Sequence, residues 1–433
     1  MVLYFYKTPY KDNMHILWVC NIKLPEIADY YGEKRRVNYG WLSGIVSSLS
    51  DNQKSNLIVC FPHKTKEVLF GKAGGYTFYS YYRDDNHQYN KYTEACFEKI
   101  FSEVKPDVIH IFGTEYMHTL AAVNASLKTG YIDRVVISIQ GMVSVIAGHY
   151  YADLPIWVRY YRTLRDIIRK TSIAKQRQSF KKRGEYEIEA IQKVSHIIGR
   201  TEWDKACSQR INSRAIYYTC NESLRDAFYE KQKWTLEHCE RHSIFVTQSS
   251  YPIKGFHVLL KAVAELKLSY PDIKVYTTGN DLINNSFMSN QKLDGYKRYI
   301  KMLIKKLGLQ DNIEFLGDLD AEEVKYYLLR SNCFVLPSCI ENSPNSLGEA
   351  MLLGVPCVSA DVGGVKSMMT HGVDGFLYPY DEPYMAAFYI GRIFDDEKLC
   401  RQLSDRAHDH ALITHNRNAN LNQLLSIYNQ ISK

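Results

Sequence analysis

The chain has 433 residues, of which 45% are hydrophobic and 23% charged, values typical of a globular protein whose length favours two domains of about 200 residues. No stretch reaches the roughly 18–20 uninterrupted apolar residues of a membrane-spanning helix, and charges and a proline interrupt the start before any secretory-type apolar run forms. The ten cysteines lie scattered without a CxxC pair, so we expect reduced thiols in a cytoplasmic protein.

Short apolar runs alternate with longer helical patterns, which is typical of parallel α/β units. Strands are predicted in the first half at 15–20, 56–61, 108–112, 134–139 and 196–199. Strands are predicted in the second half at 244–247, 273–278, 313–316, 333–337 and 356–360. Such continuously apolar strands belong to sheets that helices cover on both faces. We therefore predict an α/β protein with two Rossmann-like, doubly wound domains, at 1–230 and 240–414, and a helix at 415–433 that packs back on the first.

A basic segment lies within the first series of strands, between those predicted at 134–139 and 196–199. From 159 to 183 there are ten Lys and Arg residues and one acid, Asp166. Helical spacing over 157–170 places Trp157, Tyr161, Leu164 and Ile168 on one side and Arg159, Arg162, Arg165 and Arg169 on the other. A basic amphipathic helix of this kind suits an anionic membrane surface, which makes 157–183 a candidate membrane contact. The alternative is a helix packed on the core with a solvated basic side; no nucleic-acid module is evident, so no nucleic-acid partner is expected.

The most informative segment runs from 333 to 360, CFVLPSCIENSPNSLGEAMLLGVPCVSA. Its first residues read as a strand, and Ser343-Pro344 is a good helix start with Ser343 as the N-cap. Gly354 ends the predicted helix, and a second strand follows. Glu341 then lies in the loop at the carboxyl end of a strand, where open α/β sheets bind ligands.

The predicted helix start has a chemical consequence. Free N–H groups near Asn345, Ser346 and Leu347 would carry partial positive charge, which suits a diphosphate. Glu349 lies about one and a half turns into the helix, so two carboxylates bracket the anion site, and a carboxylate can accept hydrogen bonds from sugar hydroxyls. The alternative is a capped amphipathic helix whose glutamates are merely solvated.

Glu341 and Glu349, followed by AMLLGVPCVSADVGG, resemble the E-x7-E signature of the family-four retaining glycosyltransferases of GT-B fold, especially those that build bacterial surface polysaccharides. The resemblance is specific over 244–378 and looser before it. It implies that Glu349 holds the donor ribose, that Glu341 lies by the donor sugar, and that Lys254, in the pair Lys254-Gly255, contacts the donor phosphates.

The chain departs from the family pattern at two positions. Ser249 stands where the family usually has an arginine, so the phosphate site holds one positive charge fewer unless another basic residue replaces it. Gln140 stands where many members have a histidine that contacts the donor sugar, and glutamine cannot shuttle protons. His149, nine residues on, is a candidate for the same space.

Further candidates lie in the first half. Gly40 in NYGWLSGI is either a close approach to the donor phosphate or a plain turn. In PDVIHIFGTE, His110 and Glu115 would lie near the cleft, although a histidine inside a strand run is more often part of the core. Arg200 follows a strand and is a candidate for neutralising phosphate.

No metal ion or other cofactor is expected. Asp318 and Asp320 have the spacing of a metal-binding pair, but Asp320 precedes the helical run AEEVKYYLL and is predicted to be its N-cap. The leaving diphosphate would instead be stabilised by Lys254 and the helix N-terminus.

The sequence therefore predicts transfer of a hexose or hexosamine from a nucleoside diphosphate sugar, UDP- or GDP-linked, to the hydroxyl of a lipid-linked acceptor or growing polysaccharide. The resemblance implies retention of the anomeric configuration, with Glu341 and Lys254 as catalytic residues. Two alternatives remain open from the sequence: a non-hydrolysing sugar-nucleotide epimerase, and a catalytically silent sugar-nucleotide-binding protein.

Overall fold

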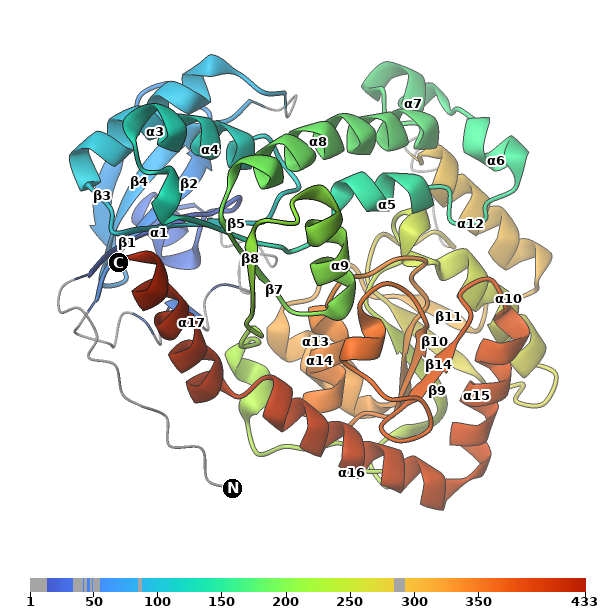
Figure 1. Cartoon of the computed structure of the whole chain (residues 1–433). Coiled ribbons are helices and arrows are strands. Elements are labelled where there is room, and N and C mark those ends of the chain that lie inside the picture. The colour runs from blue at the N-terminus through green and yellow to red at the C-terminus, as the bar shows by residue number, and fades with distance from the viewer. Residues whose placement is uncertain are drawn as a thin grey trace.

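A computed structural model of the chain describes residues 14–33, 42, 45–46, 49, 55–84, 88–283 and 293–433. Gly40 lies outside the described residues. The chain folds into two sheets that face each other, each with helices on both sides (Figure 1).

Eight strands of the described residues form the first sheet, in the order β3-β4-β2-β1-β5-β6-β7-β8. All neighbours are parallel except β3 and β4. The strands are β1 (Met14–Val19), β2 (Ser55–His63), β3 (Phe70–Ala73), β4 (Tyr76–Tyr82), β5 (Val108–Phe112), β6 (Val135–Ser138), β7 (His196–Gly199) and β8 (Ile216–Thr219). The helices that accompany them include α1 (Pro25–Tyr30), α3 (Lys91–Val104), α4 (His118–Thr129), α5 (Val143–His149), α8 (Ile173–Lys193) and α9 (Glu202–Ile211).

The second sheet has six parallel strands in the described residues, in the order β11-β10-β9-β12-β13-β14. They are β9 (Glu240–Val246), β10 (Lys274–Thr277), β11 (Ile313–Phe315), β12 (Ser331–Leu336), β13 (Cys357–Ala360) and β14 (Phe376–Tyr378). Their helices include α10 (Phe256–Leu266), α12 (Gly295–Lys306), α13 (Ala321–Arg330), α14 (Asn345–Leu352), α15 (Pro383–Asp395) and α16 (Glu397–Thr414). In both sheets the strand order reverses next to the first strand, so the switch points lie between β1 and β5 and between β9 and β12.

The predicted α/β class with two doubly wound units is confirmed, and each of the ten predicted strands is present. Strands β3, β4, β8 and β14 escaped prediction. The β4 sequence YTFYSYY is rich in tyrosine, and the exposed β8 strand IYYT has little aliphatic character, so neither forms an aliphatic run.

The prediction of one amphipathic helix over 157–170 is wrong. Two short helices replace it, α6 (Ile156–Tyr160) and α7 (Leu164–Arg169). Tyr161 is extended, with φ −63° and ψ 137°, and Thr163 starts α7 through a capping box with Asp166. The Thr163 side chain accepts a hydrogen bond from the Asp166 amide, so a new helix begins there. The apolar spacing alone had predicted that the first helix continues through this position.

The last helix, α17 (Arg417–Ile431), returns to the first sheet (Figure 1). The Tyr428 hydroxyl accepts a hydrogen bond from Trp18 Nε1 at 2.9 Å and lies 2.6 Å from His110 Nδ1. All three side chains are almost completely buried. The first hydrophobic core is therefore completed by residues from the opposite end of the chain.

We expect Tyr428→Phe to lower the free energy of unfolding by about 1–3 kcal/mol, because it strips a buried indole N–H and a buried imidazole of their shared partner. Urea unfolding followed by tryptophan fluorescence measures this loss. Tyr384→Phe is the matched control, since its ring is 53% exposed, and equal stabilities of the two variants would contradict the prediction.

Candidate active site

A large cleft of about 1620 Å³ lies between the carboxyl ends of the two sheets. Its wall in the first half is built from segments that follow β1, β2, β4, β5 and β6, and its wall in the second half from segments that follow β9, β10, β11 and β12. Both switch points therefore open into one space, which is where doubly wound sheets bind ligands. The volume exceeds the 300–1,000 Å³ of ordinary small-molecule pockets, so there is room for two substrates.

Lys254 and Glu341 meet at the switch point of the second sheet. Lys254 Nζ lies 2.5 Å from Glu341 Oε1, and Ser338 donates to the same oxygen at 2.7 Å. Burial opposes the charged form of the lysine, but the adjacent carboxylate outweighs this and raises the pKa of Lys254 above its ordinary value. The ammonium group is therefore fixed as a positive charge in the cleft.

Glycines hold both loops of this pair in place. Gly255 has φ +68°, and a Cβ there would lie 1.7 Å from the Pro337 carbonyl oxygen. Gly363, with φ +52°, packs equally close to the Glu341 carbonyl oxygen, at 1.9 Å from a hypothetical Cβ. The Lys254-Gly255 pair and the glycines of ADVGG thus permit backbone contacts that no other residue allows.

Helix α14 points its N-terminus into the cleft. Pro344 is its cap residue, so the prediction of Ser343 as N-cap is wrong; the Ser343 hydroxyl instead contacts Met368 Sδ at 3.4 Å. Asn345 and Ser346 line the cleft, and their amides have no hydrogen-bond partner among the described residues. The Leu347 amide donates to the Pro344 carbonyl at 3.0 Å, and its side chain is fully buried. Leu347 therefore offers no group to a ligand, which corrects its place among the predicted binding residues.

Glu349 forms a bidentate ion pair with Arg225. The distances are 2.7 Å from Arg225 Nε to Oε1 and 2.8 Å from Nη2 to Oε2. Burial raises the pKa of the Glu349 carboxyl, and the guanidinium opposes that rise. Both residues line the cleft. Each carboxylate oxygen can accept more than one hydrogen bond, so the pair fixes Glu349 without exhausting it as an acceptor.

Gln140 and Glu115 form the opposing wall, at the ends of β6 and β5. Burial raises the pKa of Glu115 to about 7, and the neighbouring Glu187 carboxylate adds to the shift, while Arg183 and Arg200 oppose it. Glu115 Oε2 has no hydrogen-bond partner among the described residues. A carboxyl group with this pKa can hold or release a proton near neutral pH.

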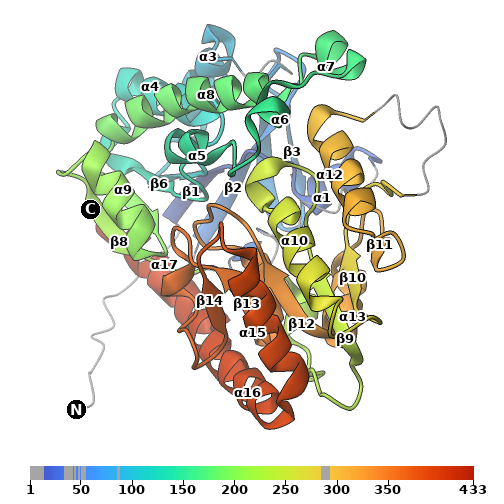
Figure 2. The ribbon, with the colours of Figure 1, turned by 90° about the vertical axis from the view of Figure 1, so that its right-hand side faces the viewer.

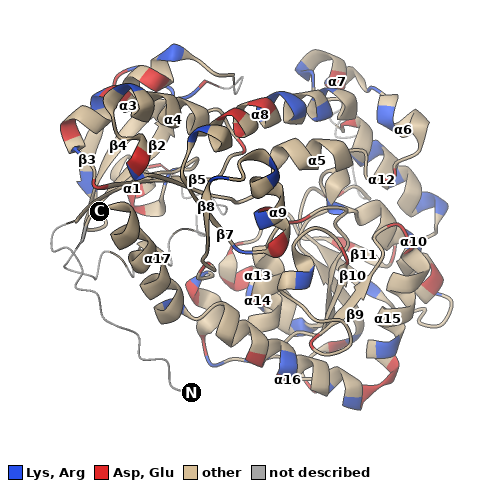
Figure 3. Cartoon of the chain, viewed as in Figure 1, with Lys and Arg blue, Asp and Glu red and all other residues tan. Residues whose placement is uncertain are grey.

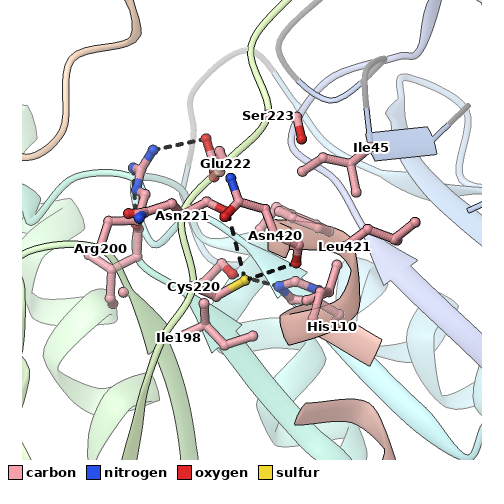
Figure 4. A pocket seen from close by; sticks show the side chains of 15 residues that line it. Ile45, His110, Ile198, Arg200, Cys220, Asn221, Glu222, Ser223, Asn420 and Leu421 are labelled. Carbon is pink, nitrogen blue, oxygen red and sulfur yellow. Dashed lines mark hydrogen bonds and ion pairs between the residues drawn. The ribbon is translucent and has the colours of Figure 1, made fainter. Parts of the chain in front are cut away.

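Arg200 lies behind this wall. Its guanidinium, 5% exposed, pairs with Glu222 at 2.8 Å, and Gln140 Nε2 donates to the same carboxylate at 2.5 Å. Arg200 lines a separate inner cavity of about 20 Å³, the size of one water molecule, together with His110 and Cys220 (Figure 4). Arg200 thus does not line the cleft, and it contacts the cleft-lining residue Gln140.

Three more predicted residues stay away from the cleft wall. His110 bonds through both ring nitrogens, to Tyr428 and to Ser138, and burial lowers its pKa to about 3, as fits the core role that the sequence favoured. The Ser249 hydroxyl donates to the Thr278 carbonyl at 3.0 Å and ties one loop to the next. His149 ends α5, exposed to solvent.

Asp320 is the N-cap of α13, as predicted, in a capping box with Glu323.

Comparison with known proteins adds a family to this geometry. Residues 229–410 match the family model described as glycosyl transferases group 1. The resemblance predicted from Glu341 and Glu349, both inside this range, is thereby confirmed.

Relatives and solved structures agree with the match. The chain is 34% identical to the N-acetyl-alpha-D-glucosaminyl L-malate synthase of Bacillus anthracis over 110 residues, 25% of this chain and 28% of that one. It is 32% identical to the amylovoran biosynthesis glycosyltransferase AmsK of Erwinia amylovora over 104 residues, 23% and 26% of the two chains. The alignments span less than half the length of these curated relatives. The structure of Anabaena Alr3699/HepE in complex with UDP and glucose superimposes with a TM-score of 0.65 over 96% of this chain and 99% of that one, at 15% identity. The fold is therefore GT-B, as predicted.

Arg225 is a cleft residue that sequence reasoning missed, and Asn342 is a buried contact between the two halves that it also missed. Arg225 lies in the linker after β8, where no strand or helix pattern draws attention to it. Asn342 accepts a hydrogen bond from Thr201 Oγ1 at 2.8 Å and so joins the two halves of the molecule. Its position beside Glu341 was the available signal.

Gly363→Ala should lower the melting temperature more than Gly372→Ala and should displace the Glu341 loop. Both glycines have positive φ, +52° and +73°, so both variants bear the left-handed strain of about 1–2 kcal/mol. Only Gly363 also meets a backbone oxygen, since nothing lies within 4 Å of a Cβ at position 372. Differential scanning fluorimetry compares the two, and equal losses would contradict the clamp on the Glu341 loop.

Proposed function

We propose that the protein is a retaining, metal-independent glycosyltransferase that moves a hexose or hexosamine from a nucleoside diphosphate sugar to an acceptor hydroxyl. The observation that carries the proposal is the arrangement in the cleft: two carboxylates, each paired with a cation, beside the unpaired amides of α14. The family match over 229–410 supports it. An epimerase is not favoured, because residues 229–410 match the model of glycosyl transferases group 1.

In this proposal the donor lies along the second wall. Glu349, held by Arg225, accepts hydrogen bonds from the ribose hydroxyls. The diphosphate lies between Lys254 and the amides of Asn345 and Ser346, which supply positive charge without a metal ion. Arg225 also compensates in part for the arginine that Ser249 replaces, since it brings a guanidinium to the same cleft.

The proposed transfer step takes its same-face attack from the family resemblance and assigns these residues to it. The bond between the sugar C1 and the phosphate oxygen breaks, and the diphosphate takes its electron pair. The acceptor oxygen bonds to C1 on the same face, and its proton passes to the departing phosphate oxygen. Lys254 stabilises the charge that develops on the phosphate. Glu341 faces the donor sugar, and Glu115 and Gln140 face the acceptor, a glycan or a lipid-linked sugar.

Glu349→Ala should weaken UDP binding by about 1.5–3 kcal/mol, because a charge-assisted hydrogen bond to the ribose is lost. Glu341→Ala should instead lower kcat more than UDP affinity, because Glu341 faces the donor sugar, whereas Lys254 and the α14 amides still bind the diphosphate. Calorimetry with UDP, GDP and ADP identifies the base, and transfer assays with glycan and lipid extracts give kcat. Glu185→Ala, at a 65% exposed carboxylate, is the control. Wild-type binding and transfer in both cleft variants would overturn the proposed site.

Arg225→Gln should make nucleotide binding depend on pH. Burial raises the pKa of Glu349 and Arg225 restrains it, so the variant carboxyl protonates at higher pH and loses its acceptor role as pH falls. Below the pKa of the variant carboxyl, the affinity should fall about tenfold for each unit of pH, because only the carboxylate accepts the hydrogen bonds. Titrations over a series of falling pH values should show this decline at higher pH in Arg225→Gln than in the wild type, and a smaller change in Arg225→Lys, which keeps the charge. Identical profiles in wild type and Arg225→Gln would contradict the role given to Arg225.

A further inference from the structure

Helices α6 and α7 carry a dense group of exposed apolar side chains. Of the 21 large apolar residues that are exposed in the described part of the chain, seven lie within 156–168. Three are more than two-thirds exposed: Ile156 at 70%, Leu164 at 77% and Ile168 at 79%. The others are Trp157, Tyr160, Tyr161 and Ile167. Single exposed apolar residues need no explanation, but a group gathered in one short segment is a candidate contact surface.

This α6–α7 surface is held facing outward by the residues beneath it. Val158 is completely buried and belongs to the core of the second sheet. Asp166 accepts a hydrogen bond from the Gly295 amide at 2.9 Å, and the Trp157 ring lies edge-on to Tyr299 with centroids 5.9 Å apart. The two short helices are thus fastened to α12 at the periphery of the molecule (Figure 2), and their apolar tips remain in water.

The same surface is positively charged. Arg162, Arg169 and Lys170 are exposed, and within the described residues none of their side chains has a hydrogen bond or an ion pair. The acid of the segment, Asp166, is 2% exposed and satisfied by backbone amides and hydroxyls. Lys and Arg continue along the neighbouring α8 and α12 (Figure 3). An apolar cluster ringed by cations is complementary to the interface of an anionic bilayer, where apolar tips enter the acyl boundary and cations meet lipid phosphates.

We propose that the α6–α7 surface docks the protein on anionic phospholipid membranes. Helices of five and six residues reach only the headgroup region, and no helix in the described ranges has the length and apolarity to pass through a bilayer. Docking is therefore peripheral. If the proposed function holds, docking also concentrates the protein at the membrane that carries lipid-linked acceptors.

Co-sedimentation of the full chain with vesicles tests this proposal. We expect binding to vesicles that contain phosphatidylglycerol, weaker binding at high salt, and little binding to pure phosphatidylcholine. A triple variant, Ile156→Ser with Leu164→Ser and Ile168→Ser, should lose at least about tenfold in partition coefficient. A second variant, with Arg162, Arg169 and Lys170 changed to Gln, should lose about as much.

Matched controls change exposed residues elsewhere. Leu268→Ser with Ile413→Ser removes two side chains that are 86% and 77% exposed, and Lys91, Arg210 and Lys398 changed to Gln remove three exposed cations. Both controls should bind vesicles like the wild type, and the melting temperature checks the fold of every variant. The assay needs neither donor nor acceptor, so it stands even if nucleotide binding fails. A wild-type chain that stays in solution with anionic vesicles, or a surface variant that binds them normally, would overturn the proposal. So would sedimentation velocity showing that the surface joins two copies of the chain without binding lipid.

Discussion

The ion pair between Arg225 and Glu349 is the interaction on which the cleft depends. A carboxylate placed near the base of a cleft loses much of its hydration, and it keeps its charge only if a cation and good geometry compensate. Arg225 supplies both, because its guanidinium donates two parallel hydrogen bonds to the carboxylate oxygens of Glu349. The guanidinium comes from the linker between the sheets, whereas the carboxylate comes from α14, so the charge of the site depends on how the two halves are joined.

The sequence located the second wall of the cleft well, because its information is local. A strand, a loop with Glu341 and a helix with Glu349 follow one another within 30 residues, and the glycines that clamp them are close by. The polar groups of the first wall were harder to assign. Whether Arg200 faces a phosphate or pairs with Glu222, and whether His110 is a ligand or a core residue, depends on partners 22 and 318 positions away. No periodicity carries that information.

The wrong expectations have physical causes of the same kind. The apolar spacing of 157–170 satisfies one helix, but a side-chain cap at Thr163 and burial of Asp166 against Gly295 favour two. The helix cap at Ser343 failed because Pro344 takes the cap position itself. The sequence correctly predicted that helices form at both places, but side-chain caps and tertiary contacts decided where each helix begins.

Helix α17 has a consequence for how the protein acquires its structure during synthesis. Trp18 and His110 are among the first buried residues to leave the ribosome, yet their partner Tyr428 comes more than 300 residues later. Until α17 is made, the apolar residues of the first sheet that it covers lack these partners. Exposed apolar surface of this kind favours aggregation with other chains. The first half of the polypeptide is thus synthesised early, but its hydrophobic core is completed only when α17 is made. Chaperone protection during translation would matter most for the side of the first sheet that α17 covers.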